Sequence, residues 1–168
     1  KAYWGQAQAL QERDDIMQAL ERKINGYQQH YFAPIQHLQK QLIDGYSGSD
    51  AAQHLLQLRA QIQEANHAGR VAECHYLDEN RCQAAIALVA LVFNAKADLY
   101  LSLLNGENVG QLLQELRDDY QLINFHGNHF SHAQLHESYL NLRLEELKFM
   151  ALMQEAPDRQ TLEQDEAC

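Results

Sequence analysis

Ten consecutive apolar residues, Ala84 to Phe93, constrain the fold more than any other part of the sequence. The run is about half as long as a membrane-spanning helix needs to be, so it predicts a buried core helix and no membrane span. The rest of the chain is poor in turn-forming residues, with only two prolines and eight glycines in 168 residues. Alanine, leucine, glutamine and glutamate are frequent, and these residues favour helix. The sequence therefore predicts an all-α fold.

Apolar spacing and capping residues place six helices, expected to form a single-domain antiparallel bundle. The longest, from about 71 to 104, is apolar nearly all round, so we expect it at the centre of the bundle, enclosed by its neighbours. Gly127 is expected to end the fifth helix, and Ser131 with Gln134 to cap the sixth. The other expected helices span about 6–25, 27–44 and 50–68, and the last two about 108–127 and 132–154.

Prolines mark two further boundaries. Pro34 either kinks the second expected helix or lies at its true beginning. Pro157 is expected to stop the last helix. The bundle domain is therefore assigned to residues 1–156, and residues 157–168 are expected to form a disordered acidic tail.

The three cysteines are Cys74, Cys82 and Cys168. If Cys74 and Cys82 lie on one helix, their backbones are about 12 Å apart along its axis, too far for a disulfide. This cysteine usage favours a reducing compartment, and we expect a cytoplasmic protein.

The chain is acidic, with 23 Asp and Glu against 13 Lys and Arg and a formal net charge of −10. No basic cluster interrupts this excess of negative charge. A phosphate backbone and an anionic lipid surface would both be repelled, so nucleic acid and anionic membrane surfaces are not expected partners.

A histidine-rich segment runs from His126 to His136. If the sixth helix begins after Ser131, His132 and His136 stand one turn apart on one face, and His129 can reach them from the preceding loop. Imidazoles in that arrangement can bind zinc or another divalent metal. The alternative is a polar loop whose neutral histidines are solvated or cap helix ends.

No catalytic motif is present, whether a nucleophile elbow, a phosphate-binding loop or a dinucleotide-binding glycine pattern. Adjacent acids, such as Asp118-Asp119 and Glu145-Glu146, are expected on solvated helix faces. These observations predict a protein that is not an enzyme.

Aromatic residues near the expected loops are candidate anchors for a protein partner. Phe125 and Phe130 flank the histidine segment, and together with His129 they form the first expected contact surface. Tyr3 and Trp4, ahead of the first helix, form the second. Packing of these rings onto the bundle's own core is the alternative.

The sequence therefore favours a non-enzymatic helical protein–protein interaction domain, acting as an adaptor, regulator or chaperone-like module. Its amphipathic helices could also complete a homodimer. One alternative is a metal-binding or metal-sensing bundle that uses His129, His132 and His136. Another is the helical domain of a secreted bacterial effector acting in the host cytosol, because the chain begins at Lys1 rather than Met and resembles an excised segment.

Overall fold

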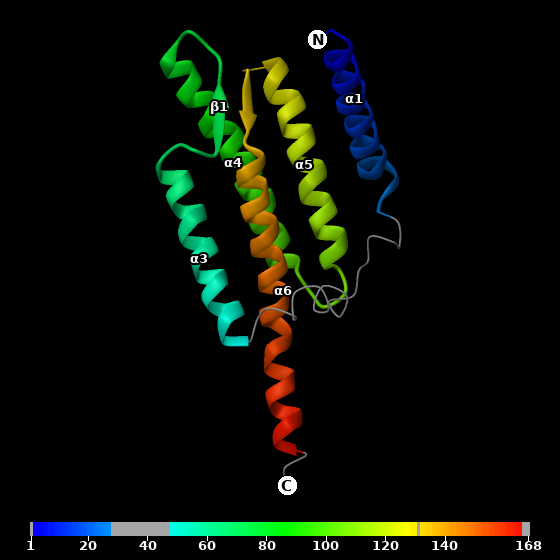
Figure 1. Cartoon of the computed structure of the whole chain (residues 1–168), viewed down its shortest axis with the longest axis vertical. Coiled ribbons are helices and arrows are strands. Elements are labelled where there is room, and N and C mark those ends of the chain that lie inside the picture. The colour runs from blue at the N-terminus through cyan, green and yellow to red at the C-terminus, as the bar shows by residue number, and fades with distance from the viewer. Residues whose placement is uncertain (1, 28–47, 131, 166–168) are drawn as a thin grey trace.

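The computed structural model describes residues 2–27, 48–130 and 132–165, with side chains described for 4–27, 50–130 and 132–154. This part of the chain contains five helices and a small two-stranded sheet (Figure 1). The all-α class is confirmed. The helices are α1 (Ala2–Asn25), α3 (Gly48–His67), α4 (Glu79–Leu103), α5 (Val109–Phe130) and α6 (Glu137–Asp165), and the strands are β1 (Ala72–Cys74) and β2 (Ala133–Leu135).

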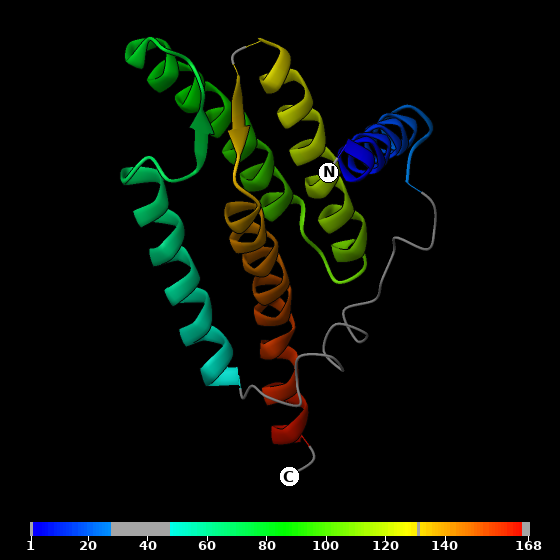
Figure 2. The ribbon, with the colours of Figure 1, turned by 45° about the horizontal axis from the view of Figure 1, so that its top comes forward.

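The main core lies where α4, α5 and the first half of α6 meet. Phe93 of α4 is fully buried there, and its ring contacts Tyr120 of α5 and Tyr139 of α6 with centroid separations of 6.4 and 5.9 Å. Aromatic pairs at these separations stabilise a core beyond the burial of their area. Further along α6, a smaller cluster packs Phe149 against α3, with Leu55 and Leu58. Helix α6 therefore joins both clusters. Figure 2 shows α6 running beside α3 and, further up, beside α4 and α5.

A short sheet replaces the expected beginning of the long helix. β1 and β2 pair antiparallel, with Ala72 opposite Leu135 and Cys74 opposite Ala133. Helix α4 begins only at Glu79, because the Asp78 side chain accepts a hydrogen bond from the Arg81 backbone N–H at 3.2 Å and caps the first turn. The prediction of helix from residue 71 is therefore wrong, since residues 71–78 precede this cap.

Gly127 does not end α5, which continues to Phe130. Gly127 instead allows α5 and β2 to approach each other closely, because a Cβ at position 127 would lie 2.5 Å from the Ala133 carbonyl oxygen of β2. The expected Ser131–Gln134 capping box is also wrong, because Gln134 lies in β2 and α6 begins at Glu137. Ser131 itself lies outside the described residues.

Helix α6 continues through Pro157 to Asp165, so the predicted end near Gln154 is wrong. A proline removes one backbone donor and crowds the preceding turn, which can bend a helix without ending it. The expected helix at 27–44, with its Pro34, falls almost wholly on residues outside the described part of the chain.

Helix α1 packs against α5 at the edge of the molecule (Figures 1 and 2). Side chains that approach the body come from its second half, where Ala19 is fully buried. Residues 4–14 are exposed throughout. The attachment of α1 therefore depends on its last three turns.

Candidate functional site

The outer side of α4 carries a continuous apolar stripe, which we call the α4 face. Its residues are spaced three and four apart, as one side of a helix requires. The sequence prediction that α4 is enclosed by other helices is not met, because Leu91 at the middle of the stripe is 67% exposed. The α4 face consists of exposed Ala84, Ala87, Leu88, Leu91, Val92, Ala95, Leu99 and Leu103.

A shallow groove of about 300 Å³ lies between the α4 face and α5. Leu88 and Val92 line it from α4, and Leu122 and Ile123 from α5. Phe130, at the end of α5, also borders the groove, and its side chain is 77% exposed. The groove widens the apolar surface beside α4, and large apolar surfaces of this kind mark interaction sites.

The first expected contact surface is divided between two sides of α5. Phe130 borders the groove beside α4, whereas Phe125 and His129 line a second groove of about 810 Å³ between α1, α5 and α6. The His129 ring lies against Phe125, with centroids 4.7 Å apart, and its Nδ1 donates a hydrogen bond to the Phe125 carbonyl oxygen at 2.8 Å. His129 and Phe130 are in α5 rather than in the expected loop, whereas Phe125 lies in the helix as expected.

The two remaining histidines of the proposed metal site are at opposite ends of β2. His132 has a left-handed backbone, with a φ of 52°, and its ring meets the Tyr76 ring edge to face. The His136 backbone N–H donates to the Val71 carbonyl oxygen at 3.0 Å. The expected helical face shared by His132 and His136 does not exist, because a strand separates them. No group of three His, Cys, Asp or Glu side chains able to hold a metal ion occurs within the described ranges.

The second expected contact surface, Tyr3 and Trp4, lies in the first turn of α1. Trp4 is highly exposed. The side chain of Tyr3 is outside the described part of the structure. The Trp4 side chain is therefore accessible from solvent, on a helix turn that lies outside the packed half of α1.

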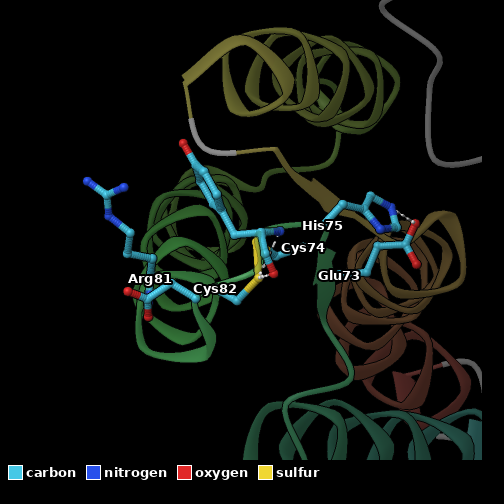
Figure 3. Close-up of a disulfide and its surroundings, with 7 residues drawn as sticks. Glu73, Cys74, His75, Arg81 and Cys82 are labelled. Atoms are coloured by element: carbon cyan, nitrogen blue, oxygen red, sulfur yellow. Dashed lines mark hydrogen bonds and ion pairs between the residues drawn. A yellow bond between two sulfur atoms is a disulfide. The ribbon is translucent and has the colours of Figure 1, made fainter.

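Cys74 and Cys82 form a disulfide, with their Cα atoms 5.4 Å apart (Figure 3). The prediction that they are too far apart is wrong, because Cys74 lies in β1 rather than on the same helix as Cys82. The bond joins the strand to the first turn of α4. Figure 3 shows Arg81 directed away from Glu73 and His75, whose side chains pair at 3.6 Å.

Two adjacent acids that were expected on a solvated face are buried on α5. Asp118 is only 1% exposed and accepts hydrogen bonds from Arg22 and Tyr27, while Asp119 pairs with Lys23 at 3.0 Å and accepts a hydrogen bond from Tyr100. Burial, strengthened by the neighbouring carboxylates, raises the pKa values of both Tyr27 and Tyr100 above the ordinary value of 10.0. Their hydroxyls therefore stay protonated and donate.

A second buried polar cluster joins α3, α4 and α6 around Arg143. Its guanidinium hydrogen-bonds to Asp98, and its Nε lies 3.0 Å from the Glu146 carboxylate. Burial alone would lower the pKa of Arg143, but Glu146 and Asp98 raise it above its usual value. Tyr139 donates to Asn94 at 2.6 Å in the same cluster. The opposite charges of Arg143 and Asp98 therefore pair between α6 and α4.

Sequence reasoning missed the α4 face, because the apolar composition of α4 does not show which side of the helix is open. A helix that is apolar on all sides was interpreted as enclosed, whereas one of its sides is open. By length and composition, α4 is long and apolar enough to cross a membrane, and it is the one such helix in the described ranges. Its most apolar stretch is only 28% buried within the protein. Exposed apolar surface on this scale is typical of interaction sites.

The family described as SNIPE associated domain matches residues 49–158, from the start of α3 into the last turns of α6. Helix α1 precedes the matched region, whereas α4, the α4 face and both strands fall within it. Neither the curated proteins nor the solved structures compared with the chain gave a match. The match covers well over half of the sequence, and the chain therefore belongs to the SNIPE associated domain family.

Proposed function

We propose that this chain is a non-enzymatic helical domain that binds another polypeptide through the α4 face. The observation that carries the proposal is the row of exposed leucines on a helix whose opposite side forms the core. Leu88, Leu91 and Leu99 present large apolar side chains to solvent and are 48%, 67% and 46% exposed. Such a stripe matches the apolar face of a partner helix.

The polar residues support a binding role over a catalytic one. Arg22 with Asp118, and Arg143 with Asp98, are paired across helix contacts. Their charges hold helices together. An enzyme would instead need acids or bases that face a substrate cleft and whose pKa values differ from one another.

The α4 face also favours an adaptor or regulatory module over a metal sensor. A metal sensor needs converging ligands, whereas His129 lines the groove between α1, α5 and α6, His136 lines a pocket beside α3, and the His132 ring lies against Tyr76. An adaptor needs a stable scaffold and a surface that a partner can cover. The two core clusters supply the scaffold, and α4 supplies the surface.

Site-specific photo-crosslinking in cells tests this function. A photoreactive amino acid at Leu91 lies at the centre of the α4 face, and the same amino acid at Leu56 of α3 is the control. The two leucines match closely, at 67% and 66% exposed. We expect discrete protein adducts from position 91 and none from position 56. Equal labelling at both positions, or no adduct at position 91, would contradict the proposal.

A further inference from the structure

We propose that the occupant of the α4 face is the α4 face of a second copy of this chain, packed antiparallel about a two-fold axis at Ala95. This inference rests on the proposed function, because it names the polypeptide that the face binds. It is supported by the charge of the face, by the sizes of its side chains and by the position of the neighbouring groove.

The charge of the face favours a second copy. The chain carries a net charge of −10, so two copies repel each other over most of their surfaces. Between Ala84 and Leu103 the only charged residues are Lys96 and Asp98, and Asp98 is already paired with Arg143. The α4 face itself carries no charged residue, so two acidic copies can meet there with only Lys96, which lines the neighbouring groove, close to the contact. It also lacks the charges that would select a charged partner.

The side-chain sizes are self-complementary about Ala95. In an antiparallel pair centred on this residue, positions equally far before and after it lie opposite each other. Ala95 then faces Ala95, which lets the two helices approach closely, and Leu91 faces Leu99. The bulky Leu103 faces the small Ala87. An arrangement of large against small side chains is what close helix packing needs.

The groove between α4 and α5 fits the same arrangement. Rotation about this two-fold axis places α5 of both copies on the same side of the two paired α4 helices. The stretch of α4 beside Leu88 and Val92 therefore faces the last turns of the other α4, which carry Leu99 and Leu103. These side chains would enter the groove that Phe130 borders. The contact is isologous, so each copy fills the groove of the other.

The size of the surface predicts a reversible dimer. From Ala84 to Leu103 the stripe is about 28 Å long at the rise of an α-helix. One helix of this length with its flanking groove is a small contact compared with the roughly 800 Å² per partner of a stable interface. We therefore expect monomer and dimer to exchange as protein concentration changes.

Engineered disulfides test the register. In a Cys168→Ser background, Ala95→Cys should form a disulfide-linked dimer on mild oxidation, because the two cysteines meet at the axis. Leu88→Cys should not crosslink to itself but should crosslink when mixed with Ser102→Cys, which lies opposite. Leu56→Cys, on an exposed site of α3, is the control and should stay monomeric. Crosslinking of Leu88→Cys to itself, without Ala95→Cys dimers, would overturn the antiparallel register.

Sedimentation equilibrium of the full chain tests the dimer without new cysteines. We expect the wild-type mass to double as concentration rises, Leu91→Glu to remain monomeric, and Leu56→Glu to behave like wild type. Circular dichroism shows whether each variant stays folded. A wild-type protein that is monomeric throughout would overturn the second-copy proposal. Flotation of such a monomer with phosphatidylcholine vesicles, lost in Leu91→Glu, would assign the face to lipid instead.

The two proposals fail separately. Adducts with a different protein at position 91, together with a monomeric purified chain, leave the binding function standing and overturn the second copy. Adducts absent at position 91, together with a monomeric chain, overturn both. Adducts at position 91 whose mass is that of two identical chains support both.

Discussion

Arg22 of α1 holds Asp118 of α5 by two hydrogen bonds, from Nε and from Nη2, each 2.7 Å long. The pair joins residues 96 positions apart in the sequence. Next to it, Lys23 approaches Asp119. Ion pairs therefore contribute more than apolar packing to the contact between α1 and α5.

Replacing Arg22 with Met should destabilise the protein by about 3 kcal/mol, because Asp118 would remain buried without its cation. Chemical unfolding in urea measures the loss. Arg13→Met on the exposed part of the same helix is the control and should change stability by less than about 0.5 kcal/mol. The double variant Arg22→Met with Asp118→Leu should recover most of the loss. Equal stability of wild type and Arg22→Met would show that the pair contributes nothing.

Gly127→Ala should destabilise the protein by about 1–3 kcal/mol, because the new methyl group would meet the Ala133 carbonyl oxygen. Gly5 offers the matched control. It also lies in a helix, but nothing is within 4 Å of a Cβ built there. Gly5→Ala should therefore stabilise α1 by about 0.5–1 kcal/mol. Thermal unfolding of both variants should show shifts of opposite sign, and shifts of the same sign would refute the close-contact role of Gly127.

Reduction of the Cys74–Cys82 disulfide should cost about 2–3 kcal/mol, the value expected for a loop of this length. The bond joins residues eight positions apart. Urea unfolding with and without dithiothreitol measures the difference, and a Cys74→Ser, Cys82→Ser variant should lose the response to the reductant. Cys168→Ser should leave the response unchanged. A wild-type protein indifferent to dithiothreitol would mean that the bond is absent in solution.

Alkaline pH should destabilise the fold through Tyr27 and Tyr100, whose pKa values burial and nearby carboxylates raise above 10.0. A group whose pKa is raised by folding contributes stability below its unfolded pKa and loses it as pH rises further. Above pH 10 the unfolded chain releases these protons while the folded protein keeps them, so stability should fall by about 1.4 kcal/mol per pH unit for each group.

The absorbance of tyrosinate during alkaline titration checks this directly. Fewer than the eight tyrosines should ionise before the protein unfolds, and all should ionise in urea. In Tyr100→Phe, the free energy of unfolding should decrease less steeply with pH above pH 10 than in the wild type. A native protein in which all tyrosines titrate near 10 would contradict the buried hydrogen bonds to Asp118 and Asp119.

The helical class and most helix positions could be predicted from apolar spacing, but the segments around the sheet could not. Strands of three residues are too short for a periodic signal, so β1 was interpreted as the start of α4. That one error placed Cys74 and Cys82 on a single helix and excluded their disulfide. Gly127 was interpreted as a helix end, since sequence alone cannot distinguish a glycine that ends a helix from one that allows a close contact.

The candidate site was only partly predictable. Phe130 was singled out and is exposed beside the groove, while Phe125 and His129 face another side of α5. The α4 face itself could not be located, because an all-apolar helix does not reveal which of its sides is covered. Burial of Asp118 likewise depends on Arg22, nearly a hundred residues away, a relationship that no local pattern contains.

The family match begins at residue 49, yet the partner of Asp118 lies before it. An isolated carboxylate at this depth would strongly disfavour folding. Family members that keep a helix equivalent to α1 and an acid at the position of Asp118 should consequently keep an arginine or lysine upstream, whereas in members without this helix the position is open to solvent and an acid needs no such partner. Covariation between these two positions would then show which relatives have inherited the N-terminal helix.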